Sequence, residues 1–279
     1  MRQRSTTSVF LGLLAFAVSG YMPVLASEYI VEHEGGYLTL HVTSQADQNG
    51  VLRAALEFSN ELGWKTYWRD PGPSGIPPSI TASSGEQEVD STIHFPHPIW
   101  ISEAYARYPG YLGKVTLPVE IRIPKGREKH ELNVHVLAGV CREICIPVMG
   151  RFEIPQSPNG FETELRSIIA VNTAFAELPA ATDRDKIVDD VKLSDGYAEV
   201  VLANNIILKD RFIAAERADR TPLALQMQSN DDNERSIRVV PDGQSEDWGD
   251  GTTVWVQGLL DNRPVSFSVL LGTDQATSR

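Results

Sequence analysis

Hydrophobic and polar residues alternate with a period of two along most of the chain, in short runs separated by turn residues. Such alternation predicts half-buried β-strands, because successive side chains of a strand point to opposite faces of its sheet. The clearest runs are 37–42, 51–58, 113–123 and 132–140 in the first half, and 186–193, 197–203, 222–228, 236–240, 252–260 and 264–271 in the second. Many short strands in each half predict an all-β protein made of two β-sandwiches.

One segment between the two halves has a helical period instead. Phe161, Leu165, Ile168, Ile169 and Phe175 fall at spacings that place them on one stripe of a helix. We expect this helix to connect the sandwiches and to pack against one of them. Recognition of a partner helix by the same stripe is the alternative.

The beginning of the chain has the pattern of a secretory signal peptide. Arg2 and Arg4 precede an apolar run at 9–18, and small residues at 24–26 form a cleavage site. The run is shorter than the roughly 20 apolar residues that a membrane helix needs, so an uncleaved anchor is the less favoured reading. We predict four segments: a signal peptide at 1–26, a first sandwich at 27–157, a helical connector at 158–180 and a second sandwich at 181–279.

The charge of the chain excludes several kinds of partner. It has 25 basic and 37 acidic side chains, hence a formal charge of −12, and removal of Arg2 and Arg4 with the leader would give 23 − 37 = −14. An acidic surface disfavours nucleic acid and anionic lipid, both of which are bound through Lys and Arg. We therefore expect an exported, periplasmic protein whose mature chain does not insert into the membrane.

Cys141 and Cys145 are the only cysteines of the chain. Residues four apart lie about 13 Å apart on a strand, and their Cβ atoms are about 5–6 Å apart on a helix, whereas a disulfide needs about 3.5–4.5 Å. The pair can close only if the chain bends between the two residues, as at the tip of a hairpin, and such a bend would expose the sulfurs. A ring this short stabilises a fold by only about 2 kcal/mol. Redox exchange is therefore favoured over a structural bridge or a site for a soft metal.

The charged residues between the cysteines have opposing effects. Arg142 would lower the pKa of the neighbouring thiol and Glu143 would raise it. Both are candidates for supporting the site, and both are equally well read as solvated turn charges.

An aromatic cluster precedes a loop rich in proline and glycine. Trp64 and Trp68 have the same parity on a strand, and Arg69 follows them. Core packing is the simpler interpretation of the tryptophans. A cap that shields the cysteines is the alternative, with Trp64, Trp68 and Arg69 as its candidates.

Other constellations are weak. His94 and His97 have no second pair of ligands at zinc-binding spacing, and the acidic residues at 242–250 do not follow the EF-hand pattern. Nucleotide-binding and hydrolase motifs are missing, as is the βαβ pattern of a thioredoxin fold. We expect no cofactor and no metal.

Three motifs together give the chain a resemblance to a known family. They are Gly63-Trp64-Lys65-Thr66-Tyr67-Trp68 running into Pro71-Gly72-Pro73-Ser74-Gly75, Tyr111-Leu112-Gly113 with Leu117-Pro118-Val119, and Val140-Cys141-Arg142-Glu143-Ile144-Cys145-Ile146-Pro147. Over about residues 45–155 the chain resembles the periplasmic N-terminal domain of the thiol:disulfide interchange protein DsbD, above all its suppressor-of-copper-sensitivity relatives. The second half resembles only loosely the further β-domain of those relatives.

The resemblance implies immunoglobulin-like sandwiches and a redox-active pair at Cys141 and Cys145. It further implies an electron donor in the membrane, namely a thiol-disulfide reductase core, and periplasmic acceptors that are thioredoxin-like proteins or disulfide-bearing clients. The chain has no membrane core of its own, so it would need a separate donor. Our hypothesis is a protein-disulfide reductase or electron relay.

Two other hypotheses stay open. One is a periplasmic copper-tolerance protein that binds Cu(I) through Cys141 and Cys145 with Met149 or His135, since thiolates and thioethers suit this soft ion. The other is a structural adaptor whose bridge only pins a hairpin.

Overall fold

The structure is a computed structural model that describes residues 29–71, 75–103, 107–128, 130–155, 165–194, 196–219, 221–226, 235–242, 248 and 251–272. The signal peptide expected at 1–26 lies outside these residues, as does Phe161 of the expected helix. None of the helices in the described segments is long and apolar enough to cross a membrane.

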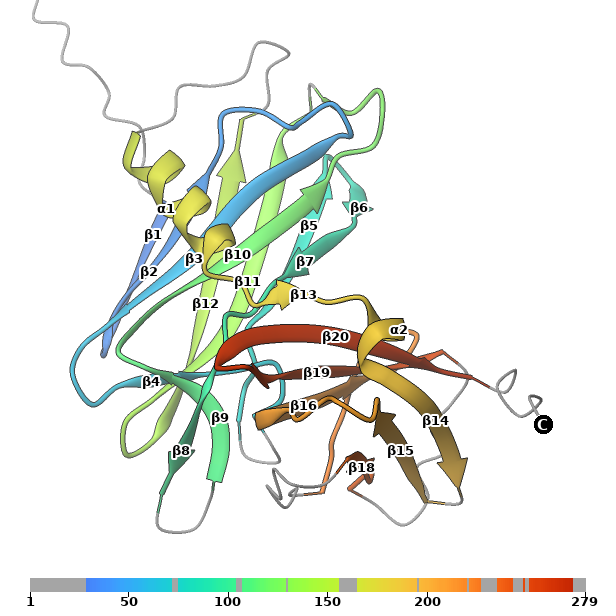
Figure 1. Cartoon of the computed structure of the whole chain (residues 1–279). Helices are drawn as coiled ribbons and strands as arrows, with labels where there is room; N and C mark the ends of the chain where they lie inside the picture. Colours follow the sequence, from blue (N-terminus) through green and yellow to red (C-terminus); the bar gives the residue numbers. More distant parts are fainter. Residues whose placement is uncertain are drawn as a thin grey trace, which may run out of the picture.

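The first half of the chain forms two antiparallel sheets that face each other (Figure 1). One has the strand order β1 (Tyr29–His33), β2 (Gly36–Val42), β3 (Val51–Asn60), β10 (Lys114–Arg122) and β7 (Ser91–Ile93). The other has the order β6 (Gln87–Val89), β5 (Ser79–Ser84), β11 (Leu132–Cys141), β4 (Lys65–Tyr67), β9 (Arg107–Leu112) and β8 (Ile99–Ser102), with β12 (Cys145–Ile154) paired to β11. β5 and β4 pair with successive parts of β11, and β12 follows its whole length.

The alternation of the sequence explains the core between these sheets. Leu52, Ala54, Leu56 and Phe58 recur at every second position of β3 and are fully buried, and β11 contributes its own alternate residues from 132 to 140. Each large apolar side chain buried in this way stabilises the fold by roughly 1.5–3 kcal/mol.

The second half forms a smaller sandwich around its own core. Its first sheet has the order β13 (Ala180–Ala181), β20 (Arg263–Leu271), β19 (Thr252–Leu260), β16 (Lys209–Glu216) and β17 (Pro222–Leu223), and its second has β14 (Val188–Ser194), β15 (Tyr197–Leu202) and β18 (Ser236–Val239). The strand predicted at 186–193 begins later than expected, because α2 (Arg184–Ile187) forms one helical turn that Asp183 caps by accepting a hydrogen bond from the amide of Asp185. The protein is thus all-β, with two immunoglobulin-like sandwiches.

The main helix, α1 (Leu165–Ala176), lies on the outer face of the first sheet against β2, β3 and β10 (Figure 1). Its buried residues are Val171 and Ala174, whereas Leu165 and Ile169 of the predicted stripe are 71% and 56% exposed. The buried residues of the helix pack against Ala55 on the outer face of the sheet. The smaller residues of the helix therefore contact this face, and the large residues of the predicted stripe remain exposed.

The two sandwiches share an aromatic interface. Phe212 of β16 belongs to the core of the first sandwich, and its ring centroid lies 5.0 Å from that of Trp100, 5.1 Å from that of His97 and 6.1 Å from that of Trp68. The side-chain amide of Gln257 donates a hydrogen bond of 2.9 Å to the carbonyl of Phe95. The second sandwich is therefore packed into the first.

Candidate functional site

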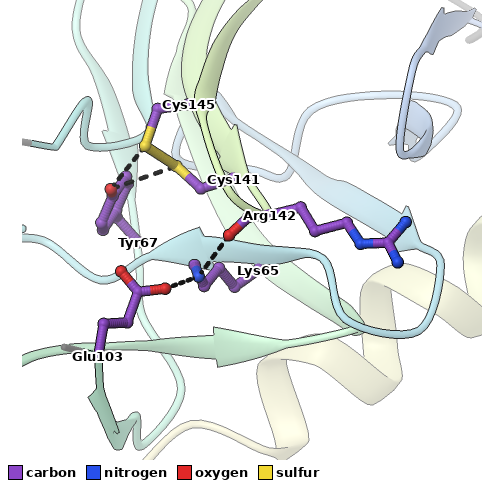
Figure 2. A network of polar contacts seen from close by, with 6 residues as sticks. All are labelled: Lys65, Tyr67, Glu103, Cys141, Arg142 and Cys145. Carbon is purple, nitrogen blue, oxygen red and sulfur yellow. Dashed lines mark hydrogen bonds and ion pairs between the residues drawn. A yellow bond between two sulfur atoms is a disulfide. The ribbon is translucent and has the colours of Figure 1, made fainter.

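The two cysteines close a disulfide across the tip of the β11–β12 hairpin (Figure 2). Cys141 ends β11, Cys145 begins β12, and the two are register partners with Cα atoms 4.1 Å apart. The bend predicted from their spacing is a loop of three exposed residues, 142–144. Burial separates the sulfur-bearing residues, since Cys145 is exposed while Cys141 is only 2% exposed. The expectation that the bend exposes both sulfurs was therefore wrong for Cys141.

Tyr67 of β4 covers the inner side of the disulfide (Figure 2). Its hydroxyl lies 3.0 Å from Sγ of Cys145 and 3.2 Å from Sγ of Cys141, within reach to donate a hydrogen bond to either sulfur. The ring passes close over β11 at Gly139, where a Cβ would lie 3.3 Å from a ring carbon of Tyr67 and 3.1 Å from Ile76. A glycine at this position is what lets the hydroxyl approach both sulfurs.

A second contact ties the loop between the cysteines to β4. The ammonium of Lys65 donates a hydrogen bond of 3.0 Å to the carbonyl of Arg142 and forms an ion pair with Glu103, which follows β8 (Figure 2). The Lys65 side chain is 8% exposed and that of Glu103 is 40% exposed. A nearly buried ammonium thus holds the backbone of the loop next to Cys141.

Burial and negative charge act on the tyrosines near the sulfurs. Burial, followed by the Glu103 carboxylate, raises the pKa of the Tyr67 hydroxyl. Burial also raises the pKa of Tyr108, whose ring centroid lies 5.0 Å from that of Tyr67, and Tyr67 and Glu103 raise it further. Both hydroxyls therefore keep their protons at neutral pH, and Tyr67 remains a donor.

The aromatic residues proposed from the sequence lie elsewhere. Trp64 and Trp68 are both buried in the core of the first sandwich, as their parity suggested. Arg69 forms an ion pair of 3.3 Å with Glu216 and places its guanidinium over the rings of Phe95 and Trp255. The contacts of these three residues are with the core and with the second sandwich, so the tryptophans and Arg69 do not cover the sulfurs.

The other proposed residues gather less closely. The side chains of Arg142 and Glu143 are exposed in the loop, as expected of turn charges. Met149 lies four residues along β12 from Cys145, and four residues of strand span about 13 Å, so its sulfur is not brought to the pair. His135 lies farther still along β11. Within the described segments, no cluster of three or more His, Cys, Asp or Glu side chains has the arrangement of a metal site.

Sequence reasoning missed Tyr67, Lys65 and Glu103. A signal for the first two was present: if Trp64 and Trp68 face the core, then residues 65 and 67 between them face the opposite side of the sheet. No pattern in the sequence connects Glu103 to Lys65, because they are 38 residues apart.

These features define a class of protein: an all-β, immunoglobulin-like sandwich with a short disulfide at a hairpin tip, one cysteine exposed and one buried. Residues 39–157 match the family model described as "Thiol:disulfide interchange protein DsbD, N-terminal". The match confirms the resemblance to this family that the sequence shows over about residues 45–155.

One solved structure supports the fold. The N-terminal periplasmic domain of ScsB from Proteus mirabilis aligns with a TM-score of 0.57 and 19% identity, over 88% of this chain and 99% of that one. The Pseudomonas aeruginosa CupB2 chaperone aligns over 79% of this chain and 93% of that one, but with a TM-score of 0.22 and 11% identity, too low to carry an argument. No curated protein sequence matches the chain.

Proposed function

We propose that the protein is a thiol–disulfide exchange module that passes electron pairs through Cys141 and Cys145. This proposal rests on the observation that the disulfide contributes little to the stability of the hairpin. The β11–β12 ladder runs without a break from Leu132 and Ile154 to the cysteines themselves, so backbone pairing already fixes the hairpin. Closing so short a ring adds only about 2 kcal/mol in the loop-entropy model.

The difference in burial supports different roles for the two sulfurs. In the reduced protein, the exposed Cys145 thiolate attacks one sulfur of a partner disulfide, forming a mixed disulfide and releasing the partner's other sulfur as a thiolate. Cys141 then attacks Sγ of Cys145, which closes the internal disulfide and releases the partner as a dithiol. Two electrons have passed to the partner, and a dithiol donor restores the pair by the reverse steps.

The proposed partners follow from the family whose model matches residues 39–157. We assign the donor role to a thiol-disulfide reductase in the membrane and the acceptor role to thioredoxin-like proteins or disulfide-bearing clients. The proposed location is the periplasm, after removal of a leader at Ala26. Copper binding gains no support from the structure, because Met149 and His135 do not approach the cysteines.

Trapping variants test the exchange chemistry. With Cys141→Ser, the exposed Cys145 should accumulate a mixed disulfide with periplasmic proteins, detected as a reducible adduct by mass. Cys145→Ser should accumulate far less, because its remaining thiol is buried. The double serine variant is the matched control. Equal absence of adducts from both single variants would refute the proposal.

A redox titration in glutathione buffers tests the same proposal without a partner. A midpoint within about −120 to −270 mV, the range of known exchange proteins, is the expected result. A midpoint below about −300 mV would instead mark a structural bridge and favour the adaptor hypothesis.

A further inference from the structure

The exchange mechanism leaves the ion pair beside the disulfide without a role. Lys65 is the register partner of Cys141 on the neighbouring strand, so the two side chains leave the sheet on the same face. The Lys65 ammonium binds the carbonyl of Arg142, and Glu103 is its counter-ion (Figure 2). The pair therefore lies directly against the loop that joins the two cysteines.

Stability alone does not explain a lysine in this place. Lysine is almost never buried unless it is paired, and removing an ammonium from water costs several kcal/mol. Apolar residues of similar volume usually stabilise a fold as well as a buried ion pair does. Lys65 is 8% exposed and has only one carboxylate and one carbonyl as its described partners. The net contribution of this ion pair to stability is therefore small, and its position beside Cys141 is the feature to explain.

The charge of Glu103 acts on the Tyr67 hydroxyl, which contacts the sulfurs. Burial, and after it this charge, raises the pKa of that hydroxyl. Arg142 and Glu143 are also charged, but they are exposed in the loop, where water and salt screen them. Among the described residues, Tyr108 also packs against the site, and its raised pKa keeps it neutral. Lys65 is thus the least screened charge of the described site, and Glu103, whose side chain is 40% exposed, is its direct ion-pair partner.

We propose that Lys65 and Glu103 are positioning residues that set the reactivity of the reduced cysteines with opposite signs. Lys65 favours the thiolate by its charge and keeps the loop in place through the Arg142 carbonyl after the disulfide opens. Glu103 disfavours the thiolate and so limits how reactive Cys145 becomes. This inference deepens the proposed function and rests on it, since reactivity matters only if the pair exchanges.

The test is the pH profile of alkylation of Cys145 in the full chain, first reduced with excess dithiol and then freed of it. Lys65→Met should raise the apparent pKa of the thiol by about one unit, and Glu103→Gln should lower it by about one unit, the lower end of what a nearby charge produces. At pH 7 the alkylation rate should fall about threefold in the first variant and rise about threefold in the second, because nucleophilicity partly offsets the change in thiolate fraction. Lys186→Met, which removes a lysine whose side chain is 78% exposed in the second sandwich, is the matched control.

Opposite directions separate this inference from a structural role. If the ion pair only supported the fold, both variants would loosen the site and change the rate in the same direction. Shifts of the same sign, or profiles within 0.3 units of the parent in both variants, would overturn the inference. If Lys65→Met fails to fold, Glu103→Gln alone tests the inference: a downward shift of the thiol pKa supports it, and no shift or an upward shift overturns it.

Failure of the inference is distinguishable from failure of the proposed function. The alkylation assay uses protein reduced in advance and needs no partner. A midpoint potential in the range of a structural bridge, together with pKa shifts of opposite sign in the two variants, would therefore refute the exchange function but not the charge effect. Normal trapping of partners with unshifted profiles would refute only the charge effect.

Discussion

Replacing Phe212 by alanine should destabilise the whole chain, although this residue belongs to the second sandwich. Phe212 is 2% exposed and lies among the rings of Trp68, Trp100 and His97 of the first sandwich. Truncating a buried phenylalanine costs about 3–5 kcal/mol, as the sum of lost transfer free energy and the cavity left behind. We expect a loss in this range because the surrounding rings are large and cannot collapse into the space.

The assay is urea unfolding of the full chain, followed by tryptophan fluorescence and by far-ultraviolet circular dichroism. In the parent protein the two signals should change together, since three tryptophans line or flank the interface. Phe212→Ala should lower the midpoint and separate the two transitions. Leu62→Ala, at a side chain that is 97% exposed, is the control and should stay within about 0.5 kcal/mol of the parent. A loss below about 1 kcal/mol for Phe212→Ala would show that the sandwiches are energetically independent.

Three further predictions concern single side chains. Tyr67→Phe removes the hydroxyl 3.0 Å from Sγ of Cys145, which costs about 1 kcal/mol of hydrogen bonding. Alkylation of the reduced protein should slow about 2.5-fold, because nucleophilicity partly offsets the loss of thiolate. An unchanged rate would contradict this role of the hydroxyl. Burial holds the pKa of His97 below its usual 6.5. The contribution of the neutral imidazole to stability is therefore present above pH 6.5 and is lost as the pH falls through the lower folded pKa. His97→Gln should flatten the fall of the unfolding free energy below pH 6.5, and equal slopes in variant and parent would refute this role of His97. Arg69→Met leaves Glu216 unpaired and should lower the free energy of unfolding by about 1–3 kcal/mol. Adding Glu216→Gln to this variant should restore part of the loss. Strictly additive losses in thermal or urea unfolding would count against a coupled pair.

Strand alternation was enough to predict most of the fold. The strands that bury only one face show a clear period of two, and the structure has strands at 36–42, 51–60, 114–122 and 132–141, close to the predicted bounds. The hairpin at the cysteines followed from distance alone, because no regular element brings residues four apart within disulfide reach.

β16 shows why alternation fails for some strands. Its central run, Phe212-Ile213-Ala214-Ala215, is buried throughout, since Ile213 and Ala215 face the core of the second sandwich while Phe212 and Ala214 face the first. A strand covered on both faces has no polar side and hence no period of two. The strand that joins the two sandwiches is therefore missing from the runs predicted by alternation.

Of the site, only the disulfide could be predicted from the sequence, because the strands around it also lack a period of two. The side chains around the sulfurs come from β4, from β9 and from Glu103 after β8, and β4 pairs with β9 and β11 across long stretches of sequence. The strands from β4 to β9 are mostly three to six residues long, too short to show a period. Unless the pairing of these strands is known, no pattern in the sequence places Glu103 near Lys65.

β4 links the candidate site to the interface between the sandwiches. Lys65 and Tyr67 leave one face of this strand toward the cysteines, and the next two residues, Trp68 and Arg69, reach Phe212 and Glu216 of the second sandwich. The second sandwich therefore holds the end of the strand whose side chains contact the disulfide and its loop. We therefore expect the reactivity of Cys145 to depend on both sandwiches, because the hydroxyl of Tyr67 contacts the sulfurs and the residues that follow it contact the second sandwich. For this reason it has to be measured on the full chain.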